Sequence, residues 1–344
     1  MSARIGIIGA GKAGERHAAG FAAQPDARVV GVADMDEGRA ARLAAGLGAT
    51  SVRAWEDLFR LGIDVLVVAT PHAFHVAPAE RAAAEGVHLL MEKPLATTLS
   101  DARRIVDVAG NADIRLAVSF VHRFREEVRR AKTWLEDAGR LQVGRETQAS
   151  RRLPSDPKWL TNASVSGGGV LMYSAIHGID RLRWFWGAEV TEVDARTRRY
   201  AADNEQVEDG VAMMLVFEGG GVATLTANAA TYPVAAPVWE TEVHGTRSMV
   251  RVRTRGFAET GSADGGGQRY DAGLDGETVR PHYNFERQAA DLLDAITNGV
   301  EPLATGLDGL RAVEICLAAY ASADSQRPVT IDEIRRSGGT SKAS

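Results

Sequence analysis

Two short stretches of this sequence carry the side chains best suited to chemistry. The first is residues 88–94, His-Leu-Leu-Met-Glu-Lys-Pro, where an apolar run ends in a glutamate, a lysine and a proline. Proline disfavours helical geometry at the preceding residue, so we expect Lys93 to be extended at the end of a strand. Its peptide bond to Pro94 is of the type that can be cis. Lys93 is one of five lysines among 40 lysine and arginine residues. Taken alone, this stretch favours a lysine that merely occupies a strand-to-helix turn, but its combination with the motifs below favours a functional amine.

The second stretch is residues 167–180, Gly-Gly-Gly-Val-Leu-Met-Tyr-Ser-Ala-Ile-His-Gly-Ile-Asp. Three glycines before a helical run permit the backbone to approach a ligand or cofactor closely. Tyr173, Ile176, His177 and Asp180 are spaced three and four apart, so we expect them on one helical face. His177 is either a functional imidazole or a helical histidine bonded to a carbonyl group. No second histidine has suitable spacing, so we predict no metal site.

A glycine-rich loop lies far upstream, at residues 9–14, Gly-Ala-Gly-Lys-Ala-Gly. It follows a short apolar segment and precedes a helical pattern. This spacing suits a tight turn at the first glycine, close approach of a pyrophosphate at the second and helix–strand packing at the third. The free amides of the helix start then favour phosphate groups. The residues expected to face a cofactor here are Gly9, Gly11, Lys12, Ala13 and Gly14.

A second apolar run, residues 28–33, ends in Asp34, twenty residues after Gly14. An acidic residue at this distance accepts hydrogen bonds from an adenosine ribose, so the sequence predicts a dinucleotide site. The carboxylate would repel a 2′-phosphate, and Met35 offers that phosphate no cation. NAD is therefore favoured over NADP, although Arg39 is near enough to keep NADP open.

Two further strand–helix units follow. Residues 64–69 form an unbroken apolar run, as a strand of a parallel sheet requires, and residues 87–91 form the next strand. Ligands of open α/β sheets bind outside the carboxyl ends of strands, so the residues after these strands should meet the glycine loop in one crevice. The further residues assigned to the cofactor are Thr70, Pro71, His72, Glu92 and Lys93.

Composition excludes several classes of protein. A chain of 344 residues allows two domains, and the net charge of −5 gives no reason to expect a nucleic-acid partner. No apolar stretch reaches the roughly 18–20 residues needed to cross a bilayer. The first residues lead directly into a strand, so no signal peptide is expected. Cys316 lies in an apolar helical pattern, which predicts a buried, inert thiol without a disulfide in the chain. We expect a cytoplasmic protein.

The alternation of strands and helices ends near residues 115–125, with a last strand at 114–120 and a helix at 126–135. Strand-like segments then cover 189–199, 207–217, 221–230 and 238–252, which predicts an antiparallel or mixed sheet. Residues 255–280 read as irregular or hairpin-like, and helices are expected at 285–296 and 310–320. The small polar residues 337–344 predict a disordered tail.

Taken together, these motifs resemble those of the glucose–fructose oxidoreductase / inositol dehydrogenase / MocA (Gfo/Idh/MocA) family. The likeness covers nearly the whole chain, including residues 285–302 and 323–329. The resemblance implies an α/β fold: an N-terminal Rossmann domain at 1–122, and a C-terminal α+β domain at 123–336 with a large, mostly antiparallel open sheet. That sheet is often used for oligomerisation, so a homodimer or homotetramer is expected. The segments that carry the resemblance are 9–14, Thr70-Pro71, 92–94, Arg123-Phe124 and 167–180.

The resemblance also implies a reaction. Lys93 would lie beside the nicotinamide and the reacting carbon, and His177 would act as general base or acid on the substrate oxygen. Oxidising a secondary alcohol removes a proton from oxygen and a hydride from carbon. A neutral imidazole suits the first task, and an ammonium group can orient the hydroxyl and stabilise alkoxide charge. This predicts an NAD(P)-dependent oxidoreductase for a secondary alcohol or ketone of a sugar, amino sugar or cyclitol.

One residue departs from the family pattern. The inositol-dehydrogenase-like pattern has an aspartate four residues before the histidine, where this chain has Tyr173. A phenol carries no charge near neutrality, so Tyr173 either joins a proton relay or shapes the sugar pocket. The departure weakens any assignment as an inositol dehydrogenase and leaves the direction of the reaction open. The residues expected to face the substrate are His122, Arg123, Trp159, Tyr173 and His177.

Several of these residues have a second interpretation. Arg123 could equally pack the domains, and Trp159 could be an ordinary core residue. Arg151 and Arg152 are either a solvated pair or a site for a substrate phosphate or carboxylate. His72 is expected near the nicotinamide ribose.

Other functions remain open within the same fold. The protein could reduce a non-sugar carbonyl or imine, or use NAD to cleave a glycosidic bond. It could also be a non-catalytic regulator that senses a dinucleotide, although the presence of both Lys93 and His177 argues against this.

Overall fold

The computed structural model describes residues 2–150, 156–200, 206–229, 237–272 and 282–338. The chain divides into two compact units. The first comprises Met1–Ala96, Asp101–Phe124 and Arg280–Leu310, and the second Thr97–Ser100, Arg125–Val279 and Arg311–Ser344. A segment late in the sequence thus belongs to the first unit. The division at residue 122 stays a prediction about folding domains.

A six-stranded sheet forms the centre of the first unit. All its strands are parallel, in the order β3-β2-β1-β4-β5-β6. This is the order of a Rossmann fold, as predicted. Every residue of β4 is fully buried, which explains its unbroken apolar sequence. The strands are β1 (Ala3–Ile8), β2 (Ala27–Ala33), β3 (Thr50–Val52), β4 (Val65–Val68), β5 (His88–Met91) and β6 (Leu116–Val118).

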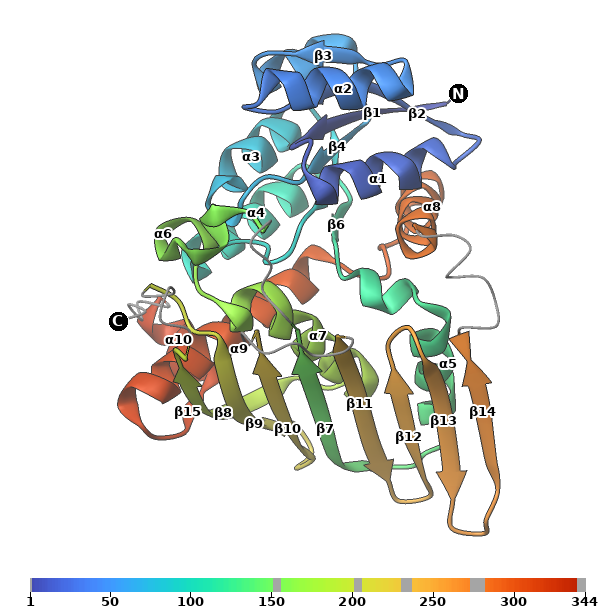
Figure 1. Cartoon of the computed structure of the whole chain (residues 1–344), viewed down its shortest axis with the longest axis vertical. Helices are drawn as coiled ribbons and strands as arrows, with labels where there is room; N and C mark the ends of the chain where they lie inside the picture. Colours follow the sequence, from blue (N-terminus) through green and yellow to red (C-terminus); the bar gives the residue numbers. More distant parts are fainter. Residues whose placement is uncertain (1, 151–155, 201–205, 230–236, 273–281, 339–344) are drawn as a thin grey trace. The chain divides into compact units, whose positions relative to one another are not determined.

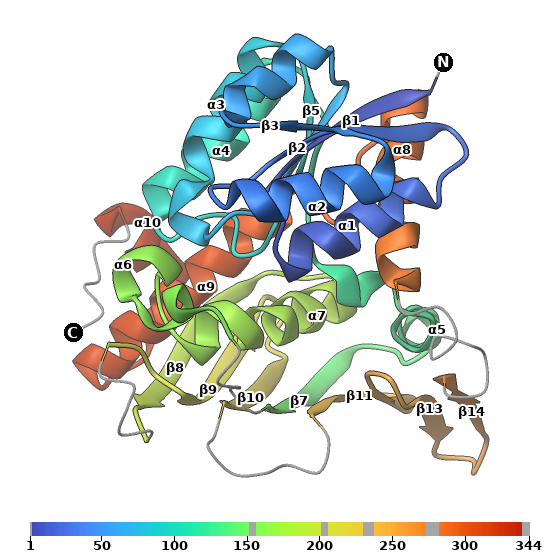
Figure 2. The ribbon, with the colours of Figure 1, turned by 45° about the horizontal axis from the view of Figure 1, so that its top comes forward.

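Helices cover both faces of this sheet (Figures 1 and 2). They are α1 (Lys12–Ala22), α2 (Glu37–Leu47), α3 (Val76–Ala84), α4 (Leu99–Asn111) and α8 (Tyr283–Asn298), with 3₁₀ turns η1 (Trp55–Leu61), η2 (His72–Phe74) and η3 (Val121–Phe124). Helix α8 lies beside α1, although the two are far apart in the sequence (Figure 1). The two helices are so close that a Cβ atom on Gly20 would lie 2.7 Å from the Phe285 carbonyl oxygen. The amide of Gln288 also donates to the Val118 carbonyl at 3.1 Å, which fixes α8 to the end of β6.

The second unit contains a nine-stranded sheet in the order β14-β13-β12-β11-β7-β10-β9-β8-β15 (Figure 1). Only β7 and β10 pair in parallel, so the prediction of a mostly antiparallel open sheet is confirmed. The strands are β7 (Leu141–Ala149), β8 (Val190–Arg198), β9 (Gly210–Phe217), β10 (Val222–Asn228), β11 (Val238–Gly245), β12 (Ser248–Arg253), β13 (Phe257–Ser262), β14 (Gly267–Asp271) and β15 (Val329–Thr330).

Strand β7 was missing from the sequence-based expectation, although it lies inside the sheet. Its buried positions are Gly144, Glu146 and Gln148, none of which is apolar. The alternation of apolar and polar residues that marks a half-buried strand is therefore absent from this sequence. The segment 238–252, expected as one strand, is two strands, and 255–280 contains the hairpin of β13 and β14.

Helices of the second unit lie on one face of its sheet (Figure 2). Helix α7 lies close to β7: a Cβ atom added to Gly178 of α7 would lie only 2.6 Å from Gln148 Nε2 of β7. Ser337 ends α10 and Gly338 caps it, so the predicted tail does not begin at 337; residues 339–344 lie outside the described residues. The helices and short turns are α5 (Glu126–Glu136), η4 (Lys158–Thr161), α6 (Ala163–Ser166), η5 (Leu171–Ala175), α7 (Ile176–Trp186), α9 (Gly306–Ser325, partly in the first unit) and α10 (Ile331–Ser337).

Candidate active site

The three glycines of the loop between β1 and α1 have different surroundings. Gly9 has a φ of +97°, and a Cβ there would lie 2.4 Å from the Ala69 carbonyl oxygen. A Cβ on Gly14 would lie 1.8 Å from the Gly9 carbonyl oxygen, so the helix can pack on the loop only with glycine there. Beside Gly11 there is no atom within 4 Å of such a Cβ. Gly9 and Gly14 thus serve the chain's own packing, and Gly11 borders open space.

Asp34 supports this loop from the end of β2. Its Oδ2 accepts a hydrogen bond from the Ala10 backbone at 2.7 Å, and its Oδ1 accepts one from the Asp36 backbone at 2.8 Å. The half-exposed guanidinium of Arg39 lies 3.3 Å from Oδ1 and also pairs with Asp36. The negative charge expected beside a ribose is therefore present, with one cation next to it.

The end of β4 presents Thr70. Its Oγ1 is buried, and no hydrogen-bond partner for it lies within the described part of the chain. The ring nitrogens of His75 lie 3.1 Å from the Thr70 carbonyl oxygen and 3.0 Å from the Leu95 carbonyl oxygen. Burial lowers the pKa of His75. His75 thus holds together the segments that follow β4 and β5, while His72 is buried one turn earlier.

Lys93 follows β5, and its peptide bond to Pro94 is cis, as the sequence allowed. The side chain is buried, with 9% of the residue exposed. Burial lowers the pKa of the amine, and the nearby charge of Glu92 acts in the opposite direction. An amine with a lowered pKa at the edge of a ligand-binding sheet is a candidate for chemistry.

The Glu92 carboxylate is turned toward the protein interior. Its Oε1 lies 2.8 Å from His17 Nε2, and its Oε2 accepts a hydrogen bond from the Lys93 backbone at 3.2 Å. Burial would raise the pKa of Glu92, but the hydrogen bond and charge of His17, the charge of Lys93 and a hydrogen bond from Ser119 hold it at about 2. Glu92 is therefore ionised at neutral pH.

In the second unit, the turn that carries Tyr173 is a π-helix, η5, which runs directly into α7. The carboxylate of Glu208 accepts hydrogen bonds from the backbone of Gly169 and Leu171, both at 2.9 Å, and from the Tyr320 hydroxyl at 3.0 Å. Burial raises the pKa of Glu208. π-Helical turns inside helices occur frequently at functional sites, and Glu208 fastens this one at its start.

The three glycines before η5 pack against the chain itself. A Cβ on Gly167 would lie 2.8 Å from Thr97, one on Gly168 1.9 Å from the Tyr320 hydroxyl, and one on Gly169 1.7 Å from the Glu208 carbonyl oxygen. The expectation that they let the backbone approach a ligand stays a prediction. Glycine is required here because protein atoms fill the space.

Tyr173 and His177 are more exposed to solvent than Ile176 and Asp180, which were expected on the same helical face. Tyr173 is 45% exposed and His177 is half-buried, whereas Ile176 and Asp180 are buried. A π-helical turn contains more residues than an α-helical turn, so the spacing used in the prediction does not hold across η5. Of these four side chains, Tyr173 and His177 are the two that remain accessible to solvent.

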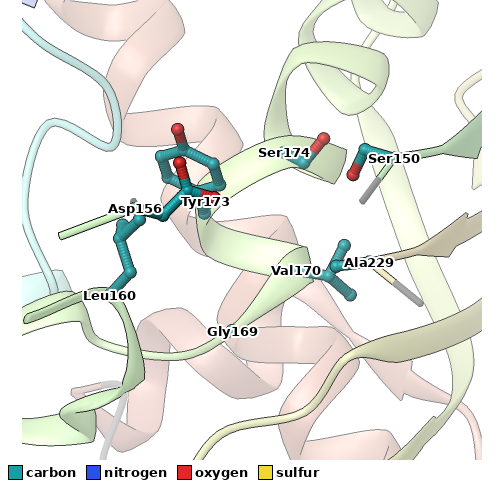
Figure 3. A pocket seen from close by; sticks show the side chains of 8 residues that line it. All are labelled: Ser150, Asp156, Leu160, Gly169, Val170, Tyr173, Ser174 and Ala229. Carbon is teal, nitrogen blue, oxygen red and sulfur yellow. The ribbon is translucent and has the colours of Figure 1, made fainter. Parts of the chain in front are cut away.

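Tyr173 borders a shallow hollow that is open to solvent. Hydroxyl- and carboxyl-bearing side chains surround it together with small apolar ones (Figure 3). The lining residues are Ser150, Asp156, Leu160, Gly169, Val170, Tyr173, Ser174 and Ala229. His177 and Trp159 are not among them. Trp159 is half-buried on η4, next to Leu160.

Arg123 is engaged in packing. Its guanidinium binds both carboxylate oxygens of Asp308 at 3.0 Å and the Leu303 carbonyl at 2.7 Å, all within the first unit. His122 precedes it on η3 and is half-buried. Arg151 and Arg152 lie outside the described residues.

Two further expectations concern reactive groups. Cys316 is buried, and burial raises the pKa of its thiol, which fits an inert side chain. Within the described ranges, no group of three or more His, Cys, Asp or Glu side chains is placed to hold a metal ion. No helix built from these residues is long and apolar enough to span a bilayer.

Comparison with family models decides the relationship of the chain to known proteins. A model of an oxidoreductase family with an NAD-binding Rossmann fold matches residues 3–120, and a model of the GFO/IDH/MocA C-terminal domain matches residues 128–251. The chain belongs to the Gfo/Idh/MocA family. The family resemblance drawn from the motifs is thus confirmed. The first matched region lies in the first unit apart from Thr97–Ser100, and the second matched region lies in the second unit.

Similar proteins match the chain over its length. An inositol 2-dehydrogenase of Rhizobium meliloti (strain 1021) is 27% identical over 336 residues, which cover 96% of this chain and 100% of that protein. Levoglucosan dehydrogenase, solved with NADH and levoglucosan, superposes with a TM-score of 0.87 at 25% identity, over 96% of this chain and 100% of that one. GenD2 from gentamicin A biosynthesis, solved with NAD, gives a TM-score of 0.84 at 25% identity and covers 96% of both chains.

Some residues that shape the site were not found in the sequence. His17 was noted only as part of a helical pattern, yet it binds Glu92. Glu208 lies 39 residues beyond Gly169, from whose backbone N–H it accepts a hydrogen bond. Both act through contacts between distant segments, which a single sequence does not reveal.

Proposed function

We propose that this protein is an NAD-dependent oxidoreductase that oxidises a secondary hydroxyl group of a sugar, amino sugar or cyclitol, or reduces the corresponding ketone. The observation that carries the proposal is the buried amine of Lys93 at the carboxyl end of β5, with its pKa lowered by burial. Relatives named for inositol and levoglucosan support the substrate class.

The residues of the first unit fit a dinucleotide. Open space beside Gly11 leaves room for a pyrophosphate at the start of α1, and the buried Oγ1 of Thr70 is a hydrogen-bonding group that a ligand could satisfy. Asp34 would accept hydrogen bonds from the adenosine ribose and disfavour a 2′-phosphate. Bound NAD would supply the nicotinamide that accepts or returns the hydride.

The side chains that line the hollow beside Tyr173 suit the chemistry of a polyhydroxylated substrate. Three hydroxyl groups and the carboxylate of Asp156 can bind sugar hydroxyls, while Leu160 and Val170 offer apolar surface to ring carbon atoms. We include this hollow in the substrate site.

In the proposed reaction, His177 takes the proton of the substrate hydroxyl and returns it in the reverse direction. Lys93, as an ammonium group, orients the same oxygen and stabilises the negative charge that develops on it. Tyr173 then contributes a hydroxyl at the substrate instead of the charge that an aspartate would bring. The open sheet of the second unit is the surface that we propose for a homodimer or homotetramer in the cytoplasm.

A substrate screen tests this function. The protein is incubated with NAD or NADP and a panel of sugars, amino sugars, cyclitols and glycosides, and formation of the reduced cofactor is followed by absorbance. We expect turnover with at least one polyol and a preference for NAD. Binding of NADH without oxidation or reduction of any compound would contradict the proposal and favour a dinucleotide-sensing regulator.

A further inference from the structure

We propose that Glu92 is a positioning residue for Lys93, and that His17 and Ser119 hold Glu92 in that role. The inference rests on the proposed function of Lys93 as the catalytic amine. It assigns Glu92 to the support of Lys93 in place of the direct cofactor contact that the sequence suggested.

The geometry places Glu92 among three different elements of the first unit. His17 Nε2 on α1 lies 2.8 Å from Glu92 Oε1 and 3.3 Å from the Ser119 hydroxyl, which follows β6. The other carboxylate oxygen, Oε2, accepts the backbone N–H of Lys93 at 3.2 Å. His17 and Ser119 are 2% and 1% exposed, so water has little access to this side of the carboxylate, although the Glu92 side chain itself is 14% exposed. The carboxylate therefore ties α1 and the end of β6 to the backbone of Lys93.

Neighbouring residues fix His17 in turn. Its ring packs edge-on against Phe285 of α8, with 5.0 Å between centroids. The Ser119 hydroxyl also lies 3.5 Å from Gln288 Oε1. His17 is three residues after Gly14, so the helix that begins at the glycine loop also carries the partner of Glu92.

The charge of Glu92 matters because Lys93 is buried. Taking an ammonium group out of water favours its neutral form, and a nearby carboxylate favours the charged form. The ionisable groups facing Glu92 are His17 from α1, Lys93 beside it and His75 after η2. Of these residues, only Lys93 donates its backbone N–H to the Glu92 carboxylate. Glu92 thus both orients Lys93 and keeps its amine able to carry a proton.

The test uses three variants of the full-length protein. Glu92→Gln removes the charge and keeps the shape, His17→Ala removes the donor, and His17→Gln keeps an amide near the position of Nε2. The matched control is His244→Gln, because His244 lies 2.9 Å from Glu242 in an exposed pair on β11. The measurements are the pKa of the Lys93 amine, from its rate of acetylation by acetic anhydride across pH, together with kcat and the Kd for NAD.

We expect Glu92→Gln to lower the pKa of the Lys93 amine and to reduce kcat by roughly tenfold or more, the scale on which supporting residues act, with little change in the Kd for NAD. His17→Ala should reduce kcat by a similar factor, whereas His17→Gln should keep most of the wild-type kcat. His244→Gln should resemble the wild type.

An unchanged amine pKa and kcat in Glu92→Gln would overturn the inference. The inference would also be overturned if His17→Gln lost as much kcat as His17→Ala. The same holds if the control His244→Gln lost as much kcat as Glu92→Gln. The acetylation measurement needs no turnover. If the wild type transfers no hydride but Glu92→Gln still shifts the amine pKa, the proposed function fails while the coupling of Glu92 to Lys93 stands.

Discussion

Arg181 and Glu146 form a buried ion pair, with Arg181 Nη2 2.5 Å from Glu146 Oε1 and both side chains excluded from solvent. Arg181 also donates to the Thr254 hydroxyl at 2.7 Å, and Thr241 donates to the other carboxylate oxygen of Glu146. Gln148 donates to Glu146 Oε1 at 3.0 Å. Helix α7, which carries His177, is thereby fastened to β7 and β11.

Removing one partner of this pair should destabilise the protein strongly. Arg181→Ala leaves Glu146 as a buried charge without its cation, which typically costs about 3–5 kcal/mol. Arg145→Ala is the matched control, because Arg145 lies next to Glu146 on β7 but pairs with Glu242 at 2.9 Å on the exposed side. It should cost less than about 1 kcal/mol. Urea denaturation measures both, and equal losses would contradict the role of the buried pair.

Two glycines of the same loop should respond in opposite ways to alanine. Gly14→Ala forces a Cβ onto the Gly9 carbonyl oxygen and should destabilise the protein by about 1–3 kcal/mol. Gly11→Ala meets no atom within 4 Å and has a φ of −82°, so its thermal midpoint should stay near that of the wild type. Its methyl group would occupy the space assigned to the pyrophosphate, and calorimetry should find NAD binding weakened by roughly tenfold, or ~1.4 kcal/mol. Unchanged NAD affinity in Gly11→Ala would place the phosphates elsewhere.

Asp34 should determine cofactor preference. Asp34→Ser removes the charge that repels a 2′-phosphate and releases the guanidinium of Arg39 from its 3.3 Å contact. We expect the ratio of the Kd values for NADP and NAD to fall by roughly tenfold, or ~1.4 kcal/mol. Arg39→Ala in the Asp34→Ser background should reverse this gain. An unchanged ratio would show that Asp34 does not face the ribose.

Acid should weaken the protein through Glu92. Its pKa is about 2 in the folded protein against an ordinary value of 4.5, so its stabilising effect is complete above pH 4.5 and is lost as the pH falls toward 2. The full difference corresponds to on the order of 3 kcal/mol. Glu92→Gln should therefore be less stable than the wild type near neutrality, with the gap narrowing as the pH falls through that window. Chemical denaturation at several pH values measures this, and a gap independent of pH would refute it.

The first unit could be predicted largely from the sequence because its signals are local. An apolar run, three glycines and a carboxylate twenty residues later follow from one strand–loop–helix–strand unit. The helix α8 was expected, but its place in the first unit was not, because its position beside α1 depends on packing of Phe285 near Gly20. Nothing in the local sequence of residues 283–298 identifies that partner.

The second unit was harder to predict because its core contains polar groups. The buried positions of β7 carry Glu146 and Gln148, which satisfy Arg181 and Ser174 across the sheet–helix layer. A pattern that assigns polar residues to the surface misses such a strand. The π-helical turn likewise has no sequence signature, so the difference in exposure between Tyr173 and Asp180 was not predicted. Arg123 had two interpretations, and its contacts with Asp308 favour packing.

The most direct test of the account is hydride transfer by a Lys93→Met variant, measured in a single turnover with the best substrate of the screen. Methionine preserves the length and apolar stem of the side chain but removes the amine. We expect the rate to fall by at least about 10²-fold, the scale for loss of a group that stabilises a developing oxyanion, while the Kd for NAD stays within about threefold of the wild type. A rate close to that of the wild type would contradict the claim that the Lys93 amine acts on the substrate oxygen.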